Sequence, residues 1–151
     1  MSAKEDYHLE RFVTAQDPVY AQVLAELQAG RKRTHWIWFI FPQIAGLGSS
    51  ATSRHYAIQS VAEARAYLAH PVLGPRLVAC VTTLLAGPAA SALAVFGQPD
   101  TLKFQSSLTL FAGVSEPGSI FERALDRFFD GQTCQTTQAF LAAAESGLSS
   151  G

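Results

Sequence analysis

The sequence contains 151 residues, of which 48% are hydrophobic and 15% are charged, and its formal net charge at pH 7 is -1. This length suits one domain with one core, and the composition is too apolar for an intrinsically disordered chain. The balanced charge excludes the broad basic surface of a general nucleic-acid-binding protein or of a protein that binds anionic membranes. Any site for an anion must therefore be local.

The sequence predicts neither export, nor a membrane span, nor a metal site. The longest apolar run, Trp36–Phe41, is far shorter than the roughly 20 residues that cross a bilayer, and residues 1–6 contain no apolar signal region. Cys80 and Cys134 are isolated from each other and from histidines at metal-ligand spacing. We therefore expect a cytoplasmic protein with two reduced thiols, no metal and no cofactor.

Helical rather than alternating periodicity of apolar residues runs through the chain, and Gly or Pro interrupts it at intervals of roughly ten residues. The first helix is predicted over residues 7–16. Asp17 and Pro18 then resemble an N-cap followed by proline at the first helical position, which predicts a second helix that ends at Gly30.

The aromatic run Trp36–Phe41 is ambiguous between a short buried helix and a buried strand. Thr34 precedes it as a potential cap, and Pro42 follows it as a terminator. These two flanking residues favour the short buried helix.

Two capping boxes mark helix starts further along the chain, Ser60–Glu63 and Ser119–Glu122. The first box opens a helix that must stop before His70-Pro71, since the residue before proline disfavours helix. The second opens a helix that ends near Gly131.

Pro75 is predicted to open a further helix that runs to Gly87. The remaining segments with helical periodicity are 90–96, 100–112 with Asp100 as its cap, and 136–144. Together these patterns predict a mainly α fold, a compact irregular array of about seven to nine short helices that forms a single domain over residues 7–144. Residues 1–6 and the Gly/Ser-rich residues 145–151 are expected to be flexible ends.

Polar residues flank the aromatic run, with His35 before it and Gln43 after it. An aromatic wall that includes Trp38, together with a few convergent polar groups, is typical of a small-molecule site. The alternative is that the tryptophans are core residues and that His35 makes a structural hydrogen bond. Residue types alone favour this alternative.

The stretch Gly46–Ser50 leads into a predicted helix that holds Arg54 and Tyr56. Free backbone N–H groups and hydroxyls at such a position favour phosphate or carboxylate. The spacing matches neither the dinucleotide-binding nor the P-loop pattern. A turn capped by serine explains the same residues.

Helical spacing places Lys103 beside Ser106 and Ser107. A lysine beside serines can hold a phosphate or, when it is neutral, assist attack by a serine hydroxyl. The simpler alternative is an ordinary solvated helix face.

With these residues in view, the chain resembles a bacterial family known as domain of unknown function 1810, some members of which carry a calpastatin label. The resemblance covers nearly everything from Tyr7 to Thr137. It rests on Arg11-Phe12, Ala15-Gln16, Tyr20, Gly30, Lys32, His35-Trp36, Trp38-Phe39, Phe41-Pro42-Gln43, Gly46, Gly48, Ser50, Tyr56-Ala57-Ile58, His70-Pro71, Leu73-Gly74, Arg76-Leu77, Lys103, Ser106-Ser107 and Phe111.

This resemblance implies a mainly helical single domain and brings no activity with it. Ile37 and Leu108 stand where the family pattern often has Met, and Cys134 stands where it usually has an acidic residue. The segment around Asp100 and Lys103 is also faintly similar to a glycosidase-like family that acts on ADP-ribose and riboflavin intermediates.

Three hypotheses follow, because a family motif that served only the core would not need so many polar residues. The first is a site, catalytic or not, for a phosphorylated or nucleotide-like small molecule. In this site His35 and Lys103 would contact the anionic group of the ligand or transfer protons. The aromatic side chains would stack on the ligand, and the other polar groups would form hydrogen bonds to it. The candidate residues are His35, Trp38, Gln43, Ser50, Tyr56, Lys103 and Ser106.

The second hypothesis is a non-catalytic interaction module, or a homodimer, that uses exposed aromatic residues as anchors. The third is purely structural, with every polar group satisfied inside a helical core. The first hypothesis requires that His35, Lys103 and the loop after Gly48 surround one hollow.

Overall fold

The computed structural model describes the backbone of residues 7–150 and the side chains of residues 7–144. This part of the chain contains ten helices and no strand, so the mainly α fold is confirmed and the helix number slightly exceeds the seven to nine predicted. In chain order the helices are α1 (Glu10–Gln16), α2 (Tyr20–Ala29), α3 (Ile37–Ile40), α4 (Ala51–His55), α5 (Val61–Ala69), α6 (Leu73–Ala86), α7 (Ala92–Phe96), α8 (Asp100–Gly113), α9 (Ile120–Phe129) and α10 (Gln135–Ser150).

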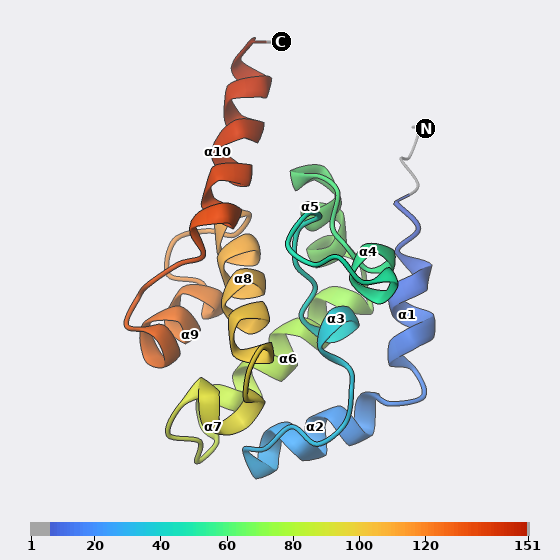
Figure 1. Ribbon diagram of the computed structural model, residues 1–151, viewed down its shortest axis with the longest axis vertical. Coiled ribbons are helices and arrows are strands. Elements are labelled where there is room, and N and C mark those ends of the chain that lie inside the picture. The colour runs from blue at the N-terminus through green and yellow to red at the C-terminus, as the bar shows by residue number, and fades with distance from the viewer. Residues whose placement is uncertain (1–6, 151) are drawn as a thin grey trace.

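Helix α8 is the central element of the fold (Figure 1). It contacts α3, α5, α7, α9 and α10, and residues 106–111 are all buried because neighbours cover it on every side. Helix α9 buries only one face, with Phe121, Ala124 and Leu125 directed inward. The core therefore forms around α8.

Aromatic rings make up much of this core. The ring of Phe104 on α8 lies 4.9 Å from that of Phe41 and 4.6 Å from that of Phe96, measured between centroids. Phe12 and Tyr67 meet edge to face at 5.1 Å and are fully buried. Each large apolar side chain buried in this way contributes roughly 1.5–3 kcal/mol to stability.

Both predicted capping boxes form helix starts. The hydroxyls of Ser60 and Ser119 accept hydrogen bonds from the backbone N–H groups of Glu63 and Glu122, respectively. Each glutamate carboxylate then accepts from the N–H of the residue before its serine, which is one position earlier than the standard box. The aromatic run also forms the short buried helix predicted for it, α3.

The predicted cap at Asp17 is wrong. Asp17 closes α1 instead, and α2 begins at Tyr20 without a side-chain cap. The Asp17 carboxylate lies 2.9 Å from the guanidinium of Arg76 on α6. The Asp17 carboxylate, which the local pattern predicted to cap α2, therefore forms an ion pair with a distant helix instead.

The predicted cap at Asp100 and the predicted helix start at Pro75 are also wrong. Pro99 occupies the N-cap position of α8, and Asp100 is the first helical residue, with its carboxylate paired to lysines. Helix α6 begins at Leu73, before Pro75, which is accommodated in the first turn where its missing N–H costs nothing.

The segment between α3 and α5 is held by one parallel bridge between Ile44 and Ile58. The N–H of Ile58 donates to the carbonyl of Gln43, and the N–H of Ala45 donates to the carbonyl of Ile58, both at 2.9 Å. This pairing fixes the position of Gln43 relative to α4 and α5.

Within residues 7–150, no single helix combines the length and the apolar composition needed to cross a bilayer. Cys80 is buried, Cys134 is half-buried, and both thiols are free. The ends predicted to be flexible, 1–6 and 145–151, lie outside the residues whose side chains the structure describes.

Candidate functional site

Three of the candidate residues, Gln43, Lys103 and Ser106, line one hollow of about 310 Å³ between the start of α8 and the loop after α3. We call it the Lys103 hollow. Leu47 and Leu102 form apolar parts of its wall. Its volume lies at the lower end of the range for small-molecule sites.

One carboxylate in this region is shared by two lysines. Asp100 lies 2.9 Å from the ammonium of Lys32 and 3.6 Å from the ammonium of Lys103. The Lys32 side chain is only 7% exposed and also lies over the ring of Trp36. Two positive charges therefore face one negative charge, and Lys103 is the less tightly held cation beside the hollow.

The two serines after Lys103 do not form a solvated face, because both are buried. The hydroxyl of Ser106 lies 3.0 Å from that of Thr137 on α10. The hydroxyl of Ser107 has no hydrogen-bond partner among the described residues. Lys103 faces Asp100, and Thr137 engages the hydroxyl of Ser106, so the geometry favours anion binding over serine activation.

Gln43 also lines a second hollow, of about 240 Å³. Its lining includes Gly46, Gly48 and Arg54, and we call it the glycine-loop hollow. Gln43 thus forms a wall common to both hollows. The predicted glycine-rich turn and the predicted lysine are linked through this one side chain.

Ser50 and Tyr56 have structural roles in the fold. Ser50 is exposed and caps α4, its hydroxyl accepting a 3.1 Å hydrogen bond from the N–H of Ser53. The Tyr56 ring packs against Phe12 and Phe39 at centroid distances of 5.7 and 5.4 Å. Neither side chain lines the Lys103 hollow or the glycine-loop hollow.

The structure does not bring His35 and Trp38 to Lys103. His35 is exposed, Trp38 is half-buried against the core, and neither lines the Lys103 hollow, the glycine-loop hollow or two further hollows. One of these further hollows lies between α8, α9 and α10, and no candidate residue lines it. His35, Lys103 and the loop after Gly48 therefore do not surround one hollow, and of the candidate residues Gln43, Lys103 and Ser106 line the Lys103 hollow.

Glu26 explains why His35 points outward. Its buried carboxylate accepts hydrogen bonds from the backbone N–H groups of Arg33 and Thr34 and from the indole of Trp36. Burial acts to raise the pKa of Glu26, but these bonds and those from Gln22 and the Thr34 hydroxyl outweigh it and lower the pKa to about 2. The loop is thereby turned so that Trp36 is buried and His35 is exposed.

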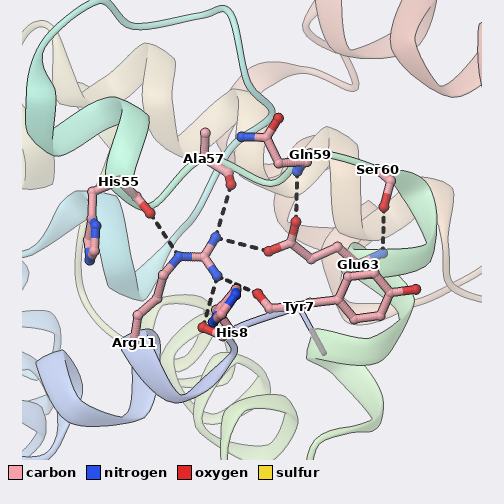
Figure 2. A network of polar contacts seen from close by, with 8 residues as sticks. All are labelled: Tyr7, His8, Arg11, His55, Ala57, Gln59, Ser60 and Glu63. Carbon is pink, nitrogen blue, oxygen red and sulfur yellow. Dashed lines mark hydrogen bonds and ion pairs between the residues drawn. The ribbon is translucent and has the colours of Figure 1, made fainter. Parts of the chain in front are cut away.

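A third and larger hollow, of about 670 Å³, lies between α1, α4 and the start of α5. We call it the Arg11 hollow. Figure 2 shows the Arg11 guanidinium at the centre of a network of polar contacts, in which all five of its N–H groups are used. They donate to the carbonyls of Tyr7, His8, His55 and Ala57 and to the carboxylate of Glu63, at 2.7–3.0 Å.

Sequence reasoning missed this network and the Glu26 carboxylate as organising groups. Arg11 lies 44–52 positions from three of its partners, and no local spacing relates them. The capping box at Glu63 was the only local signal of the Arg11 network, because the box predicts that the Glu63 carboxylate is held near a helix start. No group of His, Cys, Asp and Glu side chains within the described residues is placed to hold a metal ion.

Comparison with solved structures finds the conserved hypothetical protein Rv1873 from Mycobacterium tuberculosis, which is 46% identical with a TM-score of 0.88. The match covers 91% of this chain and 99% of that chain. No curated protein matches the chain. The family model described as protein of unknown function (DUF1810) matches residues 6–141. The chain therefore belongs to this family of proteins of unknown function, as its motif residues predicted.

Proposed function

We propose that the protein binds a small phosphorylated or nucleotide-like molecule in the Lys103 hollow. The observation that carries the proposal is the meeting of Gln43, Lys103 and Ser106, from segments distant in the chain, on one hollow with apolar walls. Residues so placed supply a charge, hydrogen-bonding groups and apolar surface within one small volume, as small-molecule sites do.

Each lining group has a role that its chemistry allows. The Lys103 ammonium, shared loosely with Asp100 at 3.6 Å, can contact a phosphate as a point charge. The Gln43 side chain can donate and accept, and the leucines can cover a flat ring. Cys134 stands in the wall where the family resemblance leads one to expect an acidic residue, so that carboxylate is absent from this hollow.

The glycine-loop hollow, which Gln43 also lines, extends the site. A ligand with two parts, such as a nucleotide, can place one part in each hollow. The contacts favour binding over acid–base catalysis, because the hydroxyl of Ser106 is bound to Thr137 and the ammonium of Lys103 faces Asp100. We place this function in the cytoplasm.

The alternative, an interaction module or homodimer with exposed aromatic anchors, has less support. Within residues 7–144 the large hydrophobic side chains that are exposed are Val78, Leu93 and Leu102, and no Phe, Tyr or Trp is among them. Aromatic residues and arginine dominate the anchors of protein interfaces, so this surface lacks the expected feature.

Thermal unfolding with AMP, ribose 5-phosphate and ADP-ribose tests the proposal, with adenosine as the uncharged counterpart of AMP. A ligand at 100 times its dissociation constant should raise the free energy of unfolding by about 2.7 kcal/mol. We expect at least one of the phosphorylated compounds to raise the midpoint and adenosine to have a smaller effect.

Three variants locate the site by calorimetric titration. Lys103→Gln should weaken binding roughly tenfold, the loss expected when a hydrogen bond to a charged group is removed. Arg31→Gln removes an exposed cation elsewhere, and His35→Ala removes the predicted residue that lies outside the hollow; both should bind as the parent does. Equal losses in Lys103→Gln and His35→Ala would contradict the proposal. Concentration-dependent dimerisation without any ligand effect would favour the alternative.

A further inference from the structure

The Arg11 hollow is separate from the Lys103 hollow and has more than enough room for a small molecule. Its volume of about 670 Å³ falls well inside the usual range for ligand sites, and it shares no lining residue with the Lys103 hollow. Arg54, Ala57 and Gln59 also line the glycine-loop hollow. We propose that this hollow is a second binding site, and that its ligand is an organic monocarboxylate with a flat apolar body.

The floor of the hollow is rigid and electrically balanced. Arg11 uses all five of its N–H groups, and Glu63 accepts from Arg11 at 2.9 Å and from the N–H of Gln59 at 2.8 Å. Both side chains are largely buried, at 15% and 3% exposed. Such a pair has no free donor to offer a ligand, and it holds the surrounding backbone in place before any ligand binds.

The charge available to a ligand comes from Arg54. Glu63 is the only carboxylate among the described residues that line the hollow, and Arg11 already balances it. Arg54 makes no ion pair with any described residue, and among these residues its guanidinium donates one hydrogen bond, to the carbonyl of Ser49. The Arg54 guanidinium, whose charge no carboxylate of the hollow balances, suits a ligand with a single negative charge. Its planar array of N–H donors suits a carboxylate.

Aromatic and amide groups line the same hollow as Arg54. In Figure 2 the imidazole of His55 and the ring of Tyr7 lie on opposite sides of the Arg11–Glu63 pair. His55 is exposed and is oriented by an edge-to-face contact with Tyr56 at 4.5 Å. Gln59 is also exposed, and only its backbone N–H is engaged in the network. Flat side chains beside one cation suit a planar body that carries a single carboxylate.

The test is an NMR titration of backbone amides with indole-3-acetate, and with indole-3-acetamide as its uncharged counterpart of nearly the same shape. We expect the carboxylate to shift the resonances of Ser60 and Glu63, which line the Arg11 hollow but not the glycine-loop hollow, at millimolar concentration or below. The amide should bind about three- to fivefold more weakly, as expected for the loss of a partly exposed charge pair.

Variants assign the charge to Arg54 and separate this site from the one proposed above. Arg54→Gln should weaken indole-3-acetate about three- to fivefold, while Arg65→Gln, an exposed arginine on α5 outside every hollow, should not. Lys103→Gln should leave indole-3-acetate binding unchanged, so either site can fail without the other. Equal binding of the acid and the amide, equal losses in the two arginine variants, or shifts confined to the Lys103 hollow would overturn the proposal, as would no shift at all.

Discussion

The indole N–H of Trp36 donates a 2.9 Å hydrogen bond to the carboxylate of Glu26, and both side chains are buried. No lysine, arginine or histidine among the described residues forms an ion pair with this carboxylate; hydrogen bonds alone stabilise its charge. The contact joins α2 to the start of α3. It therefore sets the path of the chain that leads to Gln43.

The Glu26 carboxylate should make stability depend on acid pH. Its pKa in the folded protein, about 2, lies below the ordinary value of 4.5. The ionised form therefore stabilises the fold above about pH 4.5, and this stabilisation is lost as the pH falls towards about 2. We expect Glu26 to account for a loss of about 3 kcal/mol in the free energy of unfolding across that interval.

Urea unfolding at several pH values across this interval measures the effect. Glu26→Gln should be less stable at neutral pH, because the amide cannot accept all the same hydrogen bonds, and it should lose much of the acid dependence. Glu116→Gln, which changes an exposed carboxylate, is the control. Parallel pH profiles for the parent and the Glu26 variant would show that this group is not responsible.

Adjacent serines on α8 should respond in opposite ways to the same substitution. Ser107→Ala removes a buried hydroxyl without a partner and should raise the free energy of unfolding by about 1 kcal/mol. Ser106→Ala leaves the Thr137 hydroxyl buried and unpaired. This substitution should lower the free energy of unfolding by about 1–2 kcal/mol. Denaturant unfolding of the two variants compares them directly, and equal destabilisation would mean that Ser107 has a partner after all.

Arg11→Lys should destabilise the protein although it keeps the charge. An ammonium has three donors on a single nitrogen and cannot reach the five acceptors that the guanidinium fork reaches. We expect a loss of about 2–4 kcal/mol, since the partly buried carbonyls of Tyr7 and Ala57 and the carboxylate of Glu63 would be left without partners. Thermal and urea unfolding measure the loss. Arg65→Lys, at an exposed position on α5, serves as the control, and a similar change in both variants would contradict the role assigned to Arg11.

Two helical glycines should differ in their tolerance of alanine. A Cβ on Gly74 would lie 2.1 Å from the backbone carbonyl of Leu68, which cannot move without displacing the end of α5. A Cβ on Gly113 would instead meet the tip of the Leu141 side chain at 2.5 Å, which can rotate away. Gly74→Ala should therefore cost more than about 2 kcal/mol and Gly113→Ala about 1 kcal/mol or less, as measured by urea unfolding. The reverse order would contradict the close approach at Gly74.

Local chemistry determined most of the helices. The serines at positions 60 and 119 cap their helices as predicted, because capping needs only a hydroxyl and an N–H three residues apart. The apolar stripe of α9 and the terminator Gly30 are equally local. Asp17 also matched a capping pattern, but Arg76 approaches from another helix, and a contact between distant helices cannot be read from neighbouring residues.

The site shows the same division. Residue types and family motifs identified Gln43, Lys103 and Ser106 as candidates, and the fold places them on one hollow. The same reasoning selected His35, which the hydrogen bonds of Glu26 turn outward, and it did not find the role of Arg11. The sequence by itself determined the helix ends that depend on neighbouring residues, such as the caps at Ser60 and Ser119, since those interactions span a few residues. Only the tertiary structure decided which polar groups meet, because their partners come from segments that folding alone brings together.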